Sequence, residues 1–225
     1  MRSRVATLAT LGAVALGAAF LFWLLPALLG FAGGTSPEVA SVLAAAARPP
    51  VVLSVPGSQT PLLGQKLDFQ RVTVSEESAG RARAVSTLDF EGTYGTVRVS
   101  SLGRETTHFQ RRAAGWELEG SLAPTLQAAV GALVARRRAL ESANASALSG
   151  LVLPEDRARA LGDPTLQGVL SHPTRNGTLQ AWYLRFEAGD ITVTEQEGDP
   201  VRLHRLRLVA RGPGALEFVF AGSLL

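Results

Sequence analysis

The chain has 225 residues, of which 46% are hydrophobic, with a formal net charge of +3 and no cysteine. The absence of cysteine excludes disulfides, thiolate zinc sites and cysteine nucleophiles. Lys66 is the only lysine. The basic isoelectric point therefore reflects arginine, which keeps its proton at any working pH, more than a large excess of positive charge. The length beyond the N-terminal segment fits one domain or two small ones.

The N-terminal segment predicts a membrane anchor. Arg2 and Arg4 precede residues 5–32, which contain no charged side chain. A transmembrane helix needs about 20 apolar residues, whereas the apolar region of a secretory signal runs over about 7–15. Because the arginines come first, we expect a single-pass protein of the bacterial inner membrane, with a cytoplasmic N-terminus and a periplasmic C-terminal domain. The alternative is a cleaved signal peptide, with Gly30-Phe31-Ala32 as a site of the form small-x-small.

A helix followed by strands is expected after the anchor. Ser36, Pro37 and Glu38 have the order of a helix start, with a capping serine, a proline in the first turn and an early acid. Residues 49–50 are both proline and end this helix. From residue 67 to residue 120, apolar and polar side chains alternate and glycines separate the runs. This pattern predicts an antiparallel meander with one buried face.

The second half of the chain repeats this order. Residues 124–148 have a helical period, two short helices are expected at 154–161 and 164–170, and residues 178–220 form four strand-like runs. The sequence LDFE at 88–91 matches LRFE at 184–187. We therefore expect the α+β class, with an N-terminal transmembrane helix followed by two helix-plus-antiparallel-sheet units in tandem. The expected domains are 1–32, 33–123 and 124–225.

One strand ending adds a family resemblance. Residues 115–120 read GWELEG and close the first run of strands behind its helix. This element order and the Gly115-Trp116 pair resemble the cystatin-like and nuclear-transport-factor-two-like α+β group, in its membrane-anchored bacterial form. The resemblance covers each half from its helix to its last strand. It implies a helix over a curled sheet that can enclose an apolar cone for small molecules, and a role in binding or assembly. It transfers no catalytic residue to this chain.

Arginines form the first candidate surface. Arg205, Arg207 and Arg211 share one face of a predicted strand, and residues 136–138 (Arg136, Arg137 and Arg138) lie at the polar flank of a predicted helix. Such cations suit anionic lipid headgroups or an acidic partner, and the alternative is a solvated face. Nucleic acid is not expected as a partner, because no aromatic residues are interleaved with the arginines.

Aromatic residues form the second candidate site, an apolar pocket. By strand alternation the members of each of two groups point together. The groups are Trp182, Leu184 and Phe186, and Leu216, Phe218 and Phe220. The alternative is plain packing of the sheet against a helix.

The sequence contains no pattern typical of a catalytic or metal site. His108, His172 and His204 lack the spacing of metal ligands, and no nucleophile elbow or phosphate loop is present. We therefore expect no cofactor, no metal and no enzyme activity. The leading hypothesis is a membrane-anchored interaction or scaffold module that binds another cell-envelope protein. The alternative is a protein that binds lipid or a small apolar ligand in a helix-sheet pocket. A hydrolase or isomerase would need a buried carboxylate beside His108 or His204.

Overall fold

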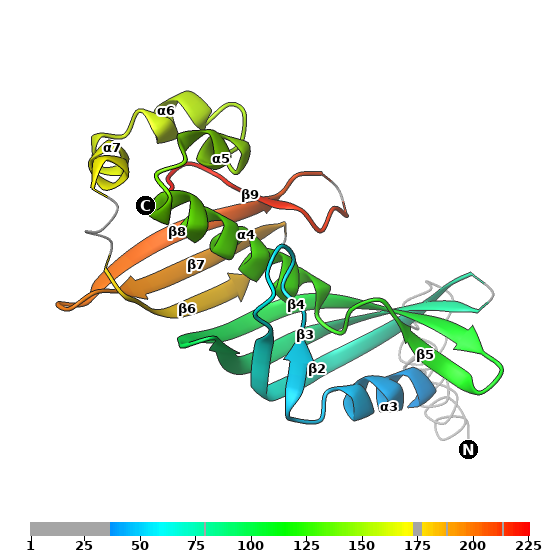
Figure 1. The fold of residues 1–225 in the computed structure, drawn as a ribbon. Coiled ribbons are helices and arrows are strands. Elements are labelled where there is room, and N and C mark those ends of the chain that lie inside the picture. The colour runs from blue at the N-terminus through cyan, green and yellow to red at the C-terminus, as the bar shows by residue number, and fades with distance from the viewer. Residues whose placement is uncertain (1–36, 79, 173–176, 188, 213) are drawn as a thin grey trace, which may run out of the picture. The chain divides into compact units, whose positions relative to one another are not determined.

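The computed structural model describes residues 37–78, 80–172, 177–187, 189–212 and 214–225 (Figure 1). The predicted anchor and the predicted helix cap Ser36 lie outside the described residues. The described part begins with helix α3 (Pro37–Ala46), at the proline that the sequence predicts as its first turn.

The strands of the described chain form one sheet. Their order is β1-β2-β3-β4-β6-β7-β8-β9, and β5 pairs with β4 beside this path. The pairs are antiparallel except for β4 with β6, which run parallel. The strands are β1 (Val51–Leu53), β2 (Leu62–Ser78), β3 (Arg81–Tyr94), β4 (Val97–Arg112), β5 (Gly115–Glu119), β6 (Leu179–Phe186), β7 (Asp190–Glu197), β8 (Arg202–Ala210) and β9 (Phe218–Phe220).

The sheet forks along strand β4. Residues 98–103 of β4 pair with β6, and residues 108–112 pair with β5. The fork therefore opens beside residues 104–107, between the last pair with β6, Gly103 with Phe186, and the first pair with β5, His108 with Glu119. One long strand thus belongs to both halves of the sheet.

Helices pack on one face of the sheet. Helix α3 lies against β2 and β5, and α4 (Pro124–Glu141) lies against β4 and β9 (Figure 1). Leu126, Val130 and Leu133 of α4 are fully buried, as a helical apolar stripe over a sheet requires. The short helices gather beside the C-terminus, and they are α5 (Ala145–Gly150), α6 (Arg157–Leu161) and α7 (Pro164–Ser171).

The predicted fold class is wrong. The described chain is mostly sheet, with 46% strand and 26% helix, and its strands form one nine-stranded sheet where two tandem α+β units were expected. The physical reason is the parallel β4–β6 pair, which joins the strands of both halves and leaves no trace in local periodicity. The boundaries 1–32, 33–123 and 124–225 stay a prediction.

The predicted membrane topology also needs correction. No helix in the part of the chain that the structure describes is long and apolar enough to cross a membrane. The longest, α4, has 18 residues and carries three consecutive arginines. The expected transmembrane helix, the single-pass topology and the periplasmic location at the bacterial inner membrane are therefore not supported by the structure.

Candidate functional site

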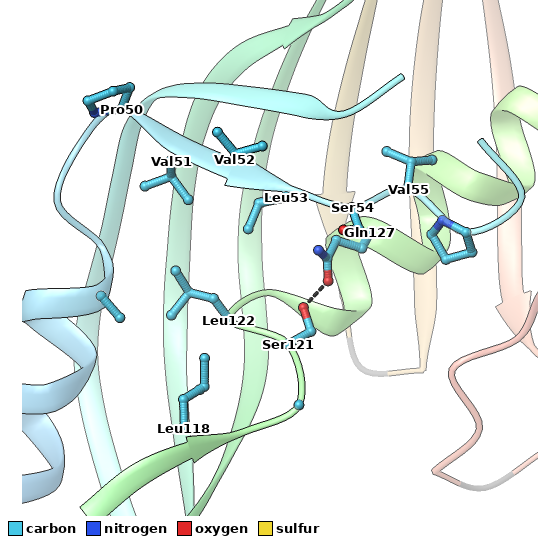
Figure 2. Close-up of a pocket in the computed structure, with 13 residues that line it drawn as sticks. Pro50, Val51, Val52, Leu53, Ser54, Val55, Leu118, Ser121, Leu122 and Gln127 are labelled. Atoms are coloured by element: carbon cyan, nitrogen blue, oxygen red, sulfur yellow. Dashed lines mark hydrogen bonds between the residues drawn. The ribbon is translucent and has the colours of Figure 1, made fainter. Parts of the chain in front are cut away.

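An open groove with a volume of about 650 Å³ lies beside strand β1 (Figure 2). One wall is the β1 segment, and the other is the stretch that leads from β5 into α4. We call it the β1 groove. Its lining residues are Ala46, Pro50, Val51, Val52, Leu53, Ser54, Val55, Pro56, Leu118, Gly120, Ser121, Leu122 and Gln127.

The β1 groove follows the edge of a strand. Successive side chains of a strand point to opposite faces, so a pocket on one face would touch every second residue. This groove touches every residue from 50 to 56. Of these, Val51 and Leu53 are buried and Val52 is 66% exposed. The groove therefore runs along the backbone edge of β1.

The β1 edge differs from the β9 and β2 edges of the sheet. At the far end, Phe220 of β9 exchanges backbone hydrogen bonds with Leu151 and Leu153, so residues 151–153 cover that edge. The outer edge of β2 beyond Gly64 carries charged residues and three register shifts, which are common protections of an open edge. Within the described residues, β1 pairs only with β2, and it carries neither a cover nor a charge. An edge of this kind is a template for another strand.

The chemistry of the β1 groove is mostly apolar. Ser121 Oγ donates a hydrogen bond to Gln127 Oε1 at one end of the opening (Figure 2). Val51 and Leu53 on one wall lie across the opening from Leu122 on the other (Figure 2). No charged side chain of the described chain lines the groove. The arrangement can hold an apolar, extended group, and it offers no acid or base.

The arginines of the predicted helical surface do not lie together on the surface. Arg136 is 1% exposed, and its Nη1 lies 3.0 Å from Glu195 Oε2. Arg137 is 13% exposed and donates to Glu197 at 2.8 Å. Arg138 donates to the backbone oxygen of Gly57. The three side chains therefore serve contacts within the protein.

The arginines of the predicted strand surface are exposed but partly neutralised. Arg207 donates to Asp190 at 2.6 Å, and Arg211 lies 2.8 Å from Glu217. Arg205 lies two residues before Arg207 on β8, so both side chains are on the same exposed face of the strand. The structure separates this strand group from the helix group, of which only Arg136 is fully buried.

A buried network centred on Glu195 is absent from the sequence-based prediction. Its carboxylate accepts hydrogen bonds from Arg136 and from Trp182 Nε1, the latter at 2.8 Å. Burial alone would raise the pKa of Glu195, but the Arg136 charge and these hydrogen bonds hold it below its usual value. The sequence does contain one clue, because Glu195 follows Ile191 and Val193 on the core face of β7.

The residues of the predicted apolar pocket mostly fill the core. Trp182, Leu184, Phe186, Phe218 and Phe220 are buried in one hydrophobic cluster. Leu216, the sixth, is 56% exposed. Phe186, Leu216 and Phe218 border an open pocket at the fork of the sheet, and Trp182 borders a separate open pocket of about 500 Å³ beside α4. A cone between helix and sheet, as the family resemblance implies, is therefore occupied by side chains at these positions.

The acid-base candidates are held in structural contacts. His204 Nε2 lies 3.2 Å from Glu197 Oε1, but Arg137 also binds that carboxylate and neither partner lines the β1 groove. Glu105 accepts from the backbone N–H groups of Thr125 and Leu126, so it caps helix α4. In the described ranges no three potential ligands gather into a metal site.

No family model matches the chain, and neither does any curated protein or solved structure. The resemblance to the cystatin-like and nuclear-transport-factor-two-like group therefore stays a prediction.

Proposed function

We propose that the chain is a non-enzymatic interaction module that binds an extended, uncharged segment of a partner protein at the β1 groove. One observation carries the proposal. The groove follows the edge of β1 along every residue from 50 to 56, without a charged lining residue in the described chain.

Strand addition explains how such a groove would bind. An added strand gains affinity from main-chain hydrogen bonds, and pockets for alternate side chains give specificity. The apolar walls at Leu53 and Leu122 would receive side chains from one face of that strand. A charged side chain would lose its hydration there without gaining a partner, so the occupant must be apolar where it faces the walls.

Selection from a library of random peptides tests the proposal. Peptides of about eight residues span an edge of this length, because a strand rises about 3.3 Å per residue. We expect selection for alternating apolar and β-branched residues and against charged ones. The Val52→Lys and Ser54→Lys variants should weaken binding of selected peptides about tenfold or more, since each places a charge at the groove. Both side chains are exposed, so the fold should persist.

Leu203→Lys is the matched control, because Leu203 on β8 is 64% exposed and does not line the groove. It should bind the selected peptides like the unaltered protein. Equal binding to all three variants would contradict the proposal. So would a library from which no peptide binds in solution.

A further inference from the structure

A second open pocket, of about 640 Å³, lies where the sheet forks. We call it the fork pocket. Residues of strands β3, β4, β6, β7, β8 and β9 contribute to it, together with Glu187, Gly189, residues 214–216 and the start of α4. Its described lining residues are Arg83, Arg104, Thr106, His108, Pro124, Thr125, Phe186, Glu187, Gly189, Asp190, Ile191, Ala210, Gly214, Ala215, Leu216 and Phe218.

The fork pocket has an apolar floor. Phe186 ends the β4–β6 pairing, Ile191 is the second residue of β7, and Phe218 begins β9. All three are less than a tenth exposed and border the pocket. Leu216 adds an apolar side chain that is 56% exposed at the same opening. The apolar part of a ligand would bury the apolar surface of this opening that is now accessible to water, which favours binding.

The acids that line the fork pocket already have partners. Glu187 lies 3.6 Å from Arg185, and Asp190 lies 2.6 Å from Arg207. Neither arginine lines the pocket. The two carboxylates are therefore not free to bind a cationic ligand without giving up these pairs.

Among the cations that line the fork pocket, Arg104 differs from Arg83 and His108 in its ion pairing. Arg83 is opposite His108 in the β3–β4 register, and both lie near Glu77, at 3.3 and 3.9 Å. Arg104, on the exposed face of β4, forms no ion pair with any described residue. Its guanidinium is thus the lining cation that is available to bind a carboxylate through two parallel hydrogen bonds.

We propose that the fork pocket binds a small amphipathic monoanion, with its carboxylate on Arg104 and its apolar body over Phe186, Ile191 and Phe218. A volume of about 640 Å³ is in the range of small-molecule sites, about 300–1,000 Å³. A dianion fits less well, because Glu187 and Asp190 would repel its second charge. This site is independent of the proposed function, since none of its described lining residues belongs to the β1 groove.

Calorimetric titration with octanoate and with 1-octanol tests the inference, because the two probes share an apolar chain and differ in the anionic head. Arg104→Gln should weaken octanoate binding about tenfold, the effect of losing about 1.4 kcal/mol, and leave 1-octanol binding unchanged. Leu216→Asp, at an exposed position, should weaken both probes. Arg205→Gln, an exposed arginine of β8 that does not line the pocket, should weaken neither.

Three outcomes would overturn the inference. The first is octanoate binding to Arg104→Gln as tight as to the unaltered protein. The second is no binding of octanoate to the unaltered protein at about millimolar concentration, the weak end of measurable affinities. The third is equally tight binding of the dianion octanedioate. Circular dichroism of each variant confirms that a loss of binding is not a loss of fold.

Discussion

Arg136 on helix α4 donates from Nη1 to both carboxylate oxygens of Glu195 on β7, at 3.2 and 3.0 Å, and each side chain is 1% exposed. Arg136 Nε also donates to the backbone oxygen of Leu224, at 2.5 Å. Glu195 in turn accepts from the Trp182 indole. One buried ion pair therefore ties α4 to the second half of the sheet and to the end of the chain.

Breaking this pair from one side should strongly destabilise the fold. Arg136→Met leaves Glu195 buried without its cation, and Glu195→Leu leaves Arg136 buried without its anion. Each should lower the free energy of unfolding by about 3–5 kcal/mol, because an uncompensated buried charge remains. Urea denaturation followed by circular dichroism measures the change.

The double variant Arg136→Met, Glu195→Leu should be more stable than either single variant. Removing both charges removes the uncompensated one, although Trp182 Nε1 then loses its acceptor. Losses that simply add in the double variant would show that the two residues act separately, which would contradict the pairing.

Glu105 should make stability fall as pH rises above the pKa of an unfolded glutamate, about 4.3. Burial raises the pKa of Glu105, although Thr125 and backbone N–H groups donate to its carboxylate. Between an unfolded value of about 4.3 and the raised value, the folded state binds more protons than the unfolded state, so the free energy of unfolding decreases with increasing pH. Glu105→Gln should remove this decrease above about pH 4.3, the unfolded value, as measured by urea denaturation at each pH.

Asp89→Asn provides the comparison for that experiment, because Asp89 is a partly exposed acid of the neighbouring strand that pairs with Lys66 at 2.6 Å. It should leave the decrease in place. If Glu105→Gln kept the full pH dependence of the unaltered protein, the decrease would have another origin.

Gly103 should tolerate no side chain. It has a positive φ of 146°, and a Cβ there would lie 2.4 Å from the backbone oxygen of Phe186, where β4 and β6 separate. Gly103→Ala should lower the free energy of unfolding by about 2 kcal/mol or more, since overpacking and backbone strain combine. Urea denaturation followed by circular dichroism measures the loss.

Gly168→Ala in α7 is the matched glycine control, because a Cβ there meets no atom within 4 Å outside its own helix. Alanine favours a helix by up to about 1 kcal/mol over glycine, so this variant should be neutral or more stable. A Gly103→Ala variant as stable as the control would mean that the two strands do not approach this closely.

The local elements were predictable because their signals are local. Proline marks the first turn of α3 at Pro37 and of α4 at Pro124, as the sequence indicates. The predicted end of the second helix at residue 148 was wrong, since α4 ends at Glu141 and Asn144 caps a separate helix through a bond from Ala147 N. A capping asparagine inside an alanine-rich run was the available clue.

The long-range features were not predictable from the same patterns. The parallel pairing joins β4 to β6, which β5 and four described helices separate along the chain. Alternation indicates which side of a sheet a residue faces, but not which strand lies beside it. The partner of Arg136 is 59 residues away, so a polar flank on a helix gave no sign of a buried ion pair. The β1 groove escaped prediction for the same reason, because its two walls meet only in the folded chain.

Hydrogen–deuterium exchange with and without a selected peptide tests the β1 groove most directly. Added-strand binding predicts slower exchange of backbone amides in residues 51–55 and 120–122, and no change in β8, because only the groove walls gain main-chain and apolar contacts. Protection that appears in β8 or the fork pocket while residues 51–55 exchange as before would contradict it.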